Sequence, residues 1–315
     1  MRVSAIDIGT NSIRLLVAEL NGGLKKILKT LETTRIGEGV DKTGCISEEA
    51  MDRSLRVLKN FKEISLGHDA EYIFAVGTSA LRDAKNKEVF IRRTKEELGL
   101  QVEIIDGERE ARLGFLGAVA QEENIRGQML VLDIGGGSTE FIVGNKNEID
   151  YSKSVDIGAV RLTERFIKHD PPLAEEVLDI EKYVDSVIED VLKNILAYDI
   201  ERIVGIGGTA TSLGAVDLGL KVYDSNRVHR HILRYERIAE ILNMFLSCDR
   251  LNRAQIPGLH PKRADIIVAG TIILKNIMEK LYKKDVIVSE WDNLEGLIME
   301  KEGEILRKNG YSQLY

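Results

Sequence analysis

Short apolar runs alternate along the chain with segments in which apolar residues recur at helical spacing. Residues 3–8 and 13–20 are apolar runs on either side of a polar turn, which predicts a β-hairpin at the start of the chain. Ser47 has the character of an N-cap, and Met51 and Leu55 follow it at helical spacing. Alternation of this kind is typical of an α/β protein.

The predicted elements fall into two groups, divided by a polar stretch at residues 121–128 that contains Gly127. We therefore expect two domains, 1–124 and 125–315, with a last helix at about 294–308 that can pack back on the first domain. Beyond the first hairpin, the predicted strands are 72–76, 102–105, 129–133, 139–143, 202–206 and 285–289, and the predicted helices are 48–58, 88–98, 108–121, 173–196, 261–281 and 294–308.

One short motif occurs twice. The segment from Ile6 to Ser12, which reads strand, Asp-Ile-Gly, turn and strand, recurs from Leu132 to Ser138. Each copy opens one of the two predicted domains. Two copies of one module that face each other make a cleft with a hairpin loop on each wall.

These loops are suited to phosphate. A Gly-rich turn presents several backbone N–H groups with no Cβ in the way, and such a concavity binds phosphate oxygens. The strand-end carboxylates Asp7 and Asp133 would repel that phosphate unless a cation such as Mg²⁺ lies between them. Either loop alone is an ordinary hairpin connector, but two matching loops favour phosphate binding. A third loop, Gly207-Gly208-Thr209, again joins a strand to a helix start.

Composition agrees with two domains and limits the partners. The 315 residues are 43% hydrophobic and 30% charged, which is enough apolar material for two cores. A net charge of −7 argues against nucleic acid as the main partner, although local basic clusters can still bind a polyanion. Cys45 and Cys248 match no metal spacing and are expected to be free thiols. With no signal peptide and no apolar run of membrane-spanning length, we expect a cytoplasmic protein without a membrane partner.

The motifs resemble, in order, those of the exopolyphosphatase/guanosine pentaphosphate phosphatase family within the actin–hexokinase–chaperone superfamily. This resemblance extends from Val3 to about Gly296 and implies two ribonuclease-H-like (actin-like) domains that face a central cleft. The segments that carry it are 7–15, 77–86, 106–113, 133–140, 207–209 and 257–259.

The resemblance also implies roles for individual residues. Glu110 matches a base that activates water, although a first-turn Glu can also serve only the helix dipole. Arg82 is expected among the catalytic residues with Glu110 and Asp133, and the expected metal ligands are Asp133, Glu140 and Asp7. The expected phosphate-binding residues are Thr10, Asn11, Ser12, Arg14, Gly135, Gly136, Gly137, Ser138, Gly207, Gly208, Thr209 and Arg263.

Two features depart from this pattern or lie outside it. Leu294 stands where the family usually has Arg in a Leu-Arg-Glu-Gly motif, so domain closure can differ here. His229 and His231 flank Arg230 in a predicted strand, which puts both imidazoles on one face. Because no third ligand is near in sequence, we favour a structural or substrate-adjacent role over metal binding.

The function that the resemblance implies is an exopolyphosphatase that uses Mg²⁺ (or Mn²⁺) and water to release terminal orthophosphate from inorganic polyphosphate. Guanosine pentaphosphate ends in the same anhydride, so a 5′-phosphohydrolase for it is the close alternative. A sensor that binds guanosine tetraphosphate and an actin-like kinase are alternatives of other classes. Substrate preference and oligomeric state, including a homodimer, are left open.

Overall fold

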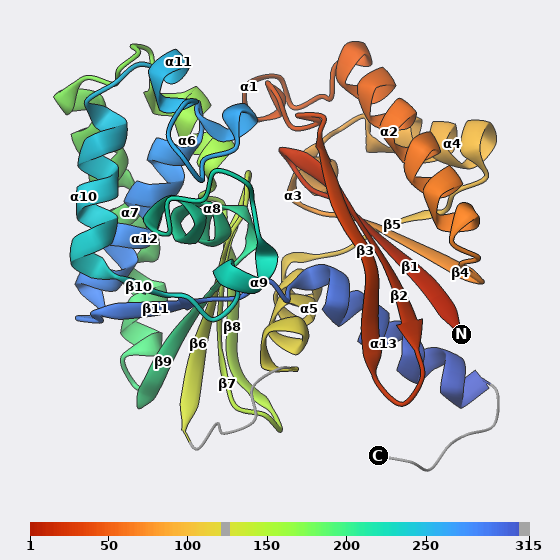
Figure 1. Ribbon diagram of the computed structural model, residues 1–315. Coiled ribbons are helices and arrows are strands. Elements are labelled where there is room, and N and C mark those ends of the chain that lie inside the picture. Colours follow the sequence, from red (N-terminus) through yellow and green to blue (C-terminus); the bar gives the residue numbers. More distant parts are fainter. Residues whose placement is uncertain (121–126, 309–315) are drawn as a thin grey trace. The chain divides into compact units, whose positions relative to one another are not determined.

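The computed structural model describes residues 1–120 and 127–308, which form two compact units (Figure 1). The first unit combines residues 1–120 with residues 291–308, and the second contains residues 127–290. The predicted boundary between residues 124 and 125 lies outside the described residues. The last helix, α13 (Asn293–Lys308), belongs to the first unit.

The sheet of the first unit has the strand order β3-β2-β1-β4-β5. Short turns join its first three strands into an antiparallel meander, whereas β4 and β5 run parallel to β1 and are reached through helices. The strands are β1 (Arg2–Ile8), β2 (Ser12–Leu20), β3 (Leu24–Thr33), β4 (Tyr72–Gly77) and β5 (Val102–Ile104).

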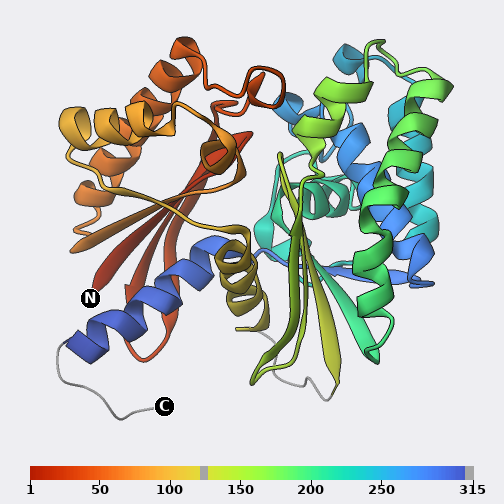
Figure 2. The same ribbon diagram turned by 180° about the vertical axis from the view of Figure 1, so that it is seen from behind.

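Helices cover both faces of this sheet (Figure 2). Because strand side chains alternate, Ile6 and Ile8 of β1 join one buried cluster and Val3 and Ala5 join another. The first cluster is covered by α2 (Glu48–Gly67) and α4 (Lys87–Leu98), the second by α5 (Gly107–Val119) and α13, and two short helices, α1 (Val40–Thr43) and α3 (Ser79–Asp83), complete the unit.

The sheet of the second unit repeats this plan. Its order is β10-β11-β9-β6-β7-β8, so a meander of β6, β7 and β8 is again followed by two parallel strands, with β10 added antiparallel at the edge. The α/β class and the two ribonuclease-H-like domains are therefore confirmed. The strands are β6 (Gln128–Ile134), β7 (Thr139–Gly144), β8 (Ile149–Val155), β9 (Ile200–Ile206), β10 (Ile232–Arg234) and β11 (Asp285–Val288).

One large apolar core holds the second unit together, with fully buried residues from β6, α7, α10 and α12. The amphipathic pattern that predicted a helix at 173–196 is confirmed by α7, whose apolar stripe includes Ile180, Val184 and Ile188. The helices are α6 (Ala159–Phe166), α7 (Ala174–Ile195), α8 (Gly207–Asp217), α9 (Ser225–Val228), α10 (Tyr235–Leu246), α11 (Arg250–Arg253), the 3₁₀ turn η1 (Pro261–Arg263) and α12 (Ile267–Lys280).

The prediction of one helix from Pro261 to residue 281 was wrong. Pro261 opens only η1, and α12 begins at Ile267. The buried guanidinium of Arg253 donates to the carbonyl of Ala264 at 2.7 Å, which occupies an acceptor that a continuous helix needs. Residues 264–266, between η1 and α12, therefore form a turn, and Arg263 is the last residue of η1.

Two strands of the structure were not predicted from the sequence pattern. They are β3, at residues 24–33, and β8, at residues 149–155. Both are third strands of a meander, and most of their side chains are only half-buried or exposed. Charged residues such as Lys25 and Lys29 interrupt the apolar pattern of β3. Strands of this kind give a weak periodic signal.

Candidate active site

The loop of the first unit, from Gly9 to Ser12, is a tight turn in which the Gly9 amide donates to the Ser12 carbonyl at 3.1 Å. The carbonyls of Thr10 and Asn11 accept from the amides of Gly37 and Arg35 at 3.0 and 2.9 Å. Within the described ranges, the amides of Thr10 and Asn11 donate to no acceptor. This turn buries the predicted residues Thr10, Asn11 and Ser12. Two of its backbone amides remain available as hydrogen-bond donors for a ligand.

The loop of the second unit has the same turn, since the Gly135 amide donates to the Ser138 carbonyl at 3.0 Å. The start of α6 holds this loop. The Gly135 carbonyl accepts from the Ala159 amide at 2.9 Å, and the Gly137 carbonyl from Nε of Arg161 at 2.8 Å. Since the carbonyl and N–H of adjoining residues point in opposite directions across a peptide plane, these bonds turn the loop amides away from α6.

Three amides of this second loop remain as donors. Among the residues that the structure describes, those of Gly136, Gly137 and Ser138 have no acceptor. The close approach of α6 depends on Gly158, because a Cβ there would lie 2.4 Å from the Gly136 carbonyl oxygen. Neither Gly158 nor Arg161 was singled out from the sequence. The only available signal was a Gly just before a helical pattern.

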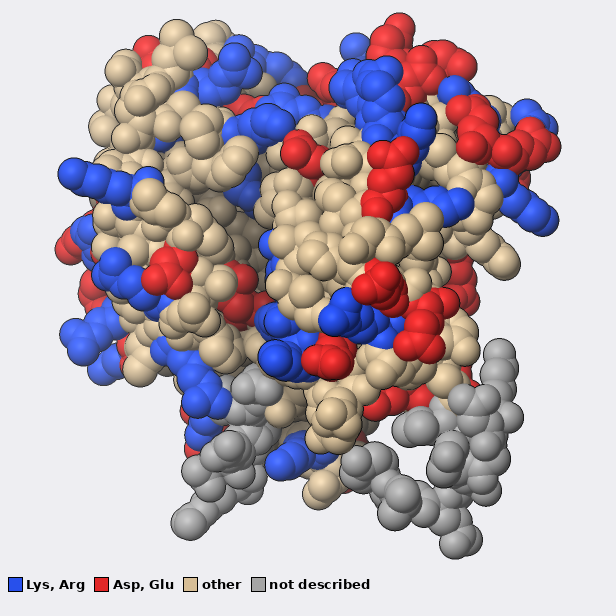
Figure 3. Space-filling view, turned by 45° about the vertical axis from the view of Figure 1, so that its right-hand side comes forward, with Lys and Arg blue, Asp and Glu red and all other residues tan. Residues whose placement is uncertain are grey.

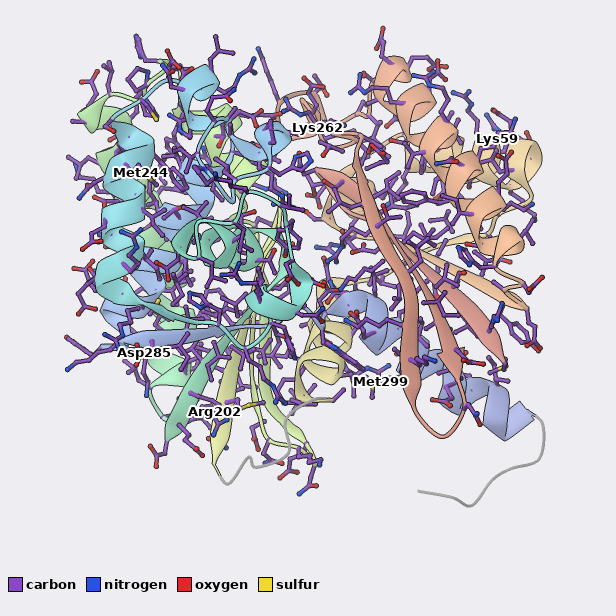
Figure 4. All side chains as sticks on the ribbon, in the orientation of Figure 1. Lys59, Arg202, Met244, Lys262, Asp285 and Met299 are labelled. Carbon is purple, nitrogen blue, oxygen red and sulfur yellow. The ribbon has the colours of Figure 1, made fainter. Side chains whose placement is uncertain are left out.

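The third predicted loop starts α8 and lies against Asp133. Gly207 has a φ of 75°, and a Cβ on it would lie 2.2 Å from Oδ1 of Asp133. A Cβ on Gly208 would lie 1.9 Å from a guanidinium nitrogen of Arg263, so Arg263 covers the first turn of α8. The Thr209 hydroxyl donates to the carbonyl of Ile134, the last residue of β6, at 3.0 Å. Its hydrogen is therefore already used in a bond within the second unit. In Figure 4, Lys262 marks the turn that carries Arg263.

Substitution of Gly207 by Ala is expected to lower kcat for phosphate release by more than about tenfold, since it displaces the Asp133 carboxylate. Gly219→Ala is the matched control, because Gly219 has a φ of 60° but open space around it. Both variants should lose about 1–2 kcal/mol of stability from the left-handed backbone. Thermal unfolding and initial rates measure the two effects. Equal kcat values for both variants would contradict the close packing of Asp133 on α8.

The strand-end carboxylates have different neighbours in the two units. In the second unit, Asp133 and Glu140 are direct cross-strand partners, so two carboxylates project from one face of the sheet. Glu140 is buried and accepts from the Ser154 hydroxyl at 2.7 Å. In the first unit the corresponding partner of Asp7 is Arg14.

Asp7 and Arg14 form an ion pair through Oδ2 of Asp7, to which Nε of Arg14 donates at 3.0 Å. The other oxygen, Oδ1 of Asp7, is buried and has no hydrogen-bond partner among the described residues, and the same holds for Oδ1 of Asn11. Within the second unit, the paired carboxylates of Asp133 and Glu140 fit a hard divalent cation that also binds water and phosphate oxygens. Within the first unit, the acceptors of Asp7 and Asn11 are oxygens of the same kind. No cluster of three His, Cys, Asp or Glu side chains suited to a metal occurs in the described part of the chain.

Glu110 and Arg82, which the sequence predicted among the catalytic residues, lie together in the first unit. Glu110 is in the first turn of α5, which begins after Asp106, and only 7% of Glu110 is exposed. Arg82 comes from α3, and its Nη1 donates to Oε2 of Glu110 at 2.9 Å and to the Ile105 carbonyl at 3.2 Å. The hydrogen bond from Arg82 therefore fixes the position of the Glu110 carboxylate.

The strand predicted around His229 and His231 was wrong. These residues lie in a turn between α9 and β10, where Arg230 has a φ of 65°. Nδ1 of His229 accepts from the Glu290 amide at 3.2 Å, whereas Nε2 of His231 lies 2.7 Å from Oδ2 of Asp217. The two imidazoles therefore serve separate contacts and form no metal site.

Leu294, which replaces the expected Arg, is fully buried in the cluster between the sheet of the first unit and α5 and α13. A cavity of about 340 Å³ on this unit, lined among others by Thr34, Arg53 and Arg56, contains none of the predicted site residues. On the face drawn in Figure 3, basic side chains are interspersed with acidic ones. No helix among the described residues is long and apolar enough to span a membrane.

Known proteins resemble this chain in sequence and in fold. The family model described as "Ppx/GppA phosphatase family" matches residues 15–305. Exopolyphosphatase 2 of Mycobacterium tuberculosis is 35% identical, with 96% of this chain aligned to 99% of that protein. A bifunctional 3-dehydroquinate synthase/phosphatase of Fusobacterium nucleatum is 38% identical over 94% of this chain, which corresponds to 46% of that longer protein.

Solved structures agree with the sequence relatives. The crystal structure of the Aquifex aeolicus member of the Ppx/GppA family is 36% identical and superposes with a TM-score of 0.81, over 98% of this chain and 99% of that one. The family model extends over residues 15–305, which begin after the first loop, and the Mycobacterium relative aligns with 96% of the chain. The chain therefore belongs to the Ppx/GppA phosphatase family.

Proposed function

We propose that this protein is an exopolyphosphatase, which hydrolyses the terminal phosphoanhydride of inorganic polyphosphate and releases orthophosphate. The observation that carries the proposal is the arrangement in the second unit, where three loop amides without acceptors adjoin the carboxylate of Asp133 and the start of α8. Amide donors and a helix N-terminus suit phosphate oxygens. The family and the name of the Mycobacterium relative support the same activity.

Each group has a role in this reaction. The amides of Gly136, Gly137 and Ser138 bind phosphate oxygens, and Arg263 adds positive charge at the start of α8. Asp133 and Glu140 would hold Mg²⁺ or Mn²⁺, which neutralises phosphate charge when bound. Glu110 takes a proton from water as the water oxygen forms a bond to the terminal phosphorus. The bridging P–O bond breaks, and its electron pair leaves with the shortened polyphosphate.

The test is release of orthophosphate from polyphosphate and from guanosine pentaphosphate, side by side, with Mg²⁺ and with a chelator. We expect release from polyphosphate that requires the divalent cation. Release from guanosine pentaphosphate alone would replace the proposal by the 5′-phosphohydrolase, which attacks the same kind of anhydride. No release from either substrate, with folded protein, would overturn both. The cytoplasmic location and the homodimer stay predictions from the sequence.

A further inference from the structure

A network of charged side chains lies under the first loop, within the first unit. Three anionic groups, Asp7, Asp292 and Glu295, are at most 5% exposed. They are paired with three cations from the meander, Arg14, Lys26 and Lys29, whose side chains are 18–26% exposed. Charges that leave water to this extent must be paired to be tolerated, so the geometry of the network is specific.

Arg14 is the link between the loop and α13. Its Nε and Nη2 both donate to Oδ2 of Asp7, and its Nη1 donates to Oδ2 of Asp292 at 2.7 Å. Arg14 thus stands between two carboxylates that are 285 residues apart in the numbering, at positions 7 and 292. A planar guanidinium that is held from both sides has little freedom to turn.

Asp292 is itself fixed by several contacts. Its Oδ1 accepts from the Leu294 amide at 3.0 Å, and its Oδ2 also accepts from Nζ of Lys29 at 3.2 Å. Burial raises the pKa of the Asp292 carboxyl, but the Arg14 and Lys29 charges outweigh this and hold its pKa below the ordinary value. Its backbone touches α5, because a Cβ on Gly117 would lie 2.1 Å from the Asp292 carbonyl oxygen. Asp292 is therefore a fixed anchor at the N-terminus of α13.

The contacts that run from Asp292 through Arg14 end at Asp7, whose second carboxylate oxygen is Oδ1. Because Arg14 donates to Oδ2, the orientation of the Asp7 carboxylate is set, and Oδ1 has no donor within residues 1–120 and 127–308. A second buried acceptor without a donor, Oδ1 of Asn11, belongs to the same loop. Two such acceptors at one loop indicate that a ligand or its bound water completes them.

We propose that Asp292 is a positioning residue, which acts through Arg14 to hold Asp7 with Oδ1 presented to the reacting complex. This inference rests on the proposed function, and it assigns Asp292 no contact with the substrate. It also changes the expected role of Arg14. In this proposal the Arg14 guanidinium donates to both Asp7 and Asp292 and holds them in place, whereas the sequence predicted a contact of Arg14 with phosphate.

The test is a double-mutant cycle of Asp292→Ser and Arg14→Gln, with kcat and KM measured for each variant. Ser keeps an N-cap oxygen that can accept from the Leu294 amide, but its shorter side chain lacks the carboxylate oxygen that contacts Arg14. We expect each single variant to lower kcat by about 10- to 30-fold with KM changed less than about threefold, since misplacement of a site group by about 1 Å can cost 10²-fold. The double variant should be no slower than Arg14→Gln alone, because both act through one contact.

Glu295→Gln is the matched control. It removes one negative charge from the same network, in which Glu295 contacts Lys26 and Lys29 at 2.6 and 3.0 Å. The amide oxygen of Gln can still accept from the Asp292 amide, as Oε2 of Glu295 does at 2.8 Å, and the ion pair between Asp292 and Arg14 keeps both of its members. We expect a lower midpoint of thermal unfolding and a kcat within about twofold of the unsubstituted enzyme. A non-activity readout is the rise in this midpoint with Mg²⁺ and orthophosphate, which should shrink for Asp292→Ser and stay for Glu295→Gln.

The outcomes separate the two proposals. If the unsubstituted protein releases no phosphate, the proposed function fails. If it is active but the two single effects multiply in the double variant, or if Glu295→Gln lowers kcat as much as Asp292→Ser, then Asp292 has only a structural role and the inference is overturned. Asp292→Asn, which keeps the side-chain volume, takes the place of Asp292→Ser in the cycle if the Ser variant does not fold.

Discussion

Replacement of Glu110 by Gln is expected to lower kcat for phosphate release by about 10²–10⁴-fold, with KM nearly unchanged. Gln keeps the size of Glu and suits the first turn of α5, but it cannot take the proton of the attacking water. Substrate affinity should persist, because the loop amides proposed to bind phosphate do not involve Glu110. Initial rates over a range of polyphosphate concentrations measure kcat and KM separately.

Glu108→Gln is the matched control for this prediction. Glu108 lies in the same first turn of α5 and makes the same favourable interaction with the helix dipole, but it is exposed. If the dipole were the reason for a Glu at position 110, both variants would lose stability alike and keep their kcat. A rise in KM with kcat unchanged for Glu110→Gln would assign it a binding role. Thermal unfolding of both variants also measures what the lost ion pair with Arg82 contributes.

Asp133→Asn is expected to lower kcat by about 10³-fold or more and to resist rescue by higher Mg²⁺ concentrations. The variant keeps the shape of the side chain against Gly207, so the fold should persist. What it loses is one of the two carboxylate charges that project from the same face of the sheet. The measurement is a Mg²⁺ titration of activity, with thermal unfolding on the same samples.

Asp150→Asn removes the same charge from an exposed position on β8 and should leave the titration unchanged. A normal turnover of Asp133→Asn at ordinary Mg²⁺ would contradict the metal-binding role of Asp133. If higher Mg²⁺ concentrations restore the activity of Asp133→Asn, then Glu140 and the substrate oxygens suffice to hold the cation. In that case Asp133 only increases the affinity for the cation, and the position of the cation depends mainly on Glu140, the cross-strand partner of Asp133.

Local sequence signals located the parts of the site that lie within a few residues of one another. The Asp-Ile-Gly repeat predicted two hairpin loops, and both have the same turn in the structure. The helix that starts at Ser47 was recognised because its capping residue is adjacent to it, and the Ser47 hydroxyl accepts from the Ala50 amide. Interactions of this range depend on the order of residues alone.

Where the local pattern failed, a distant side chain was responsible. The helix predicted from Pro261 is interrupted at Ala264 by Arg253, which donates to a carbonyl that periodicity treats as part of the helix. His229 and His231 alternate in sequence like residues of a strand, but each is held by a different partner, Glu290 or Asp217. Tertiary contacts of this kind override propensity because they satisfy buried polar groups that the local structure leaves open.

The sequence by itself determined the α/β class, the duplicated module and the loops with Asp7 and Asp133 at their strand ends, since all of these follow from periodicity, glycine and caps. Only the tertiary structure decided what those carboxylates face. Asp7 is held by Arg14 and, through it, by Asp292, whereas Asp133 lies opposite Glu140 and against Gly207. The physical reason is that a buried charge must be paired with whichever opposite charge the folded chain brings near it. The pairing of Arg14 with Asp292 is not encoded in any local pattern.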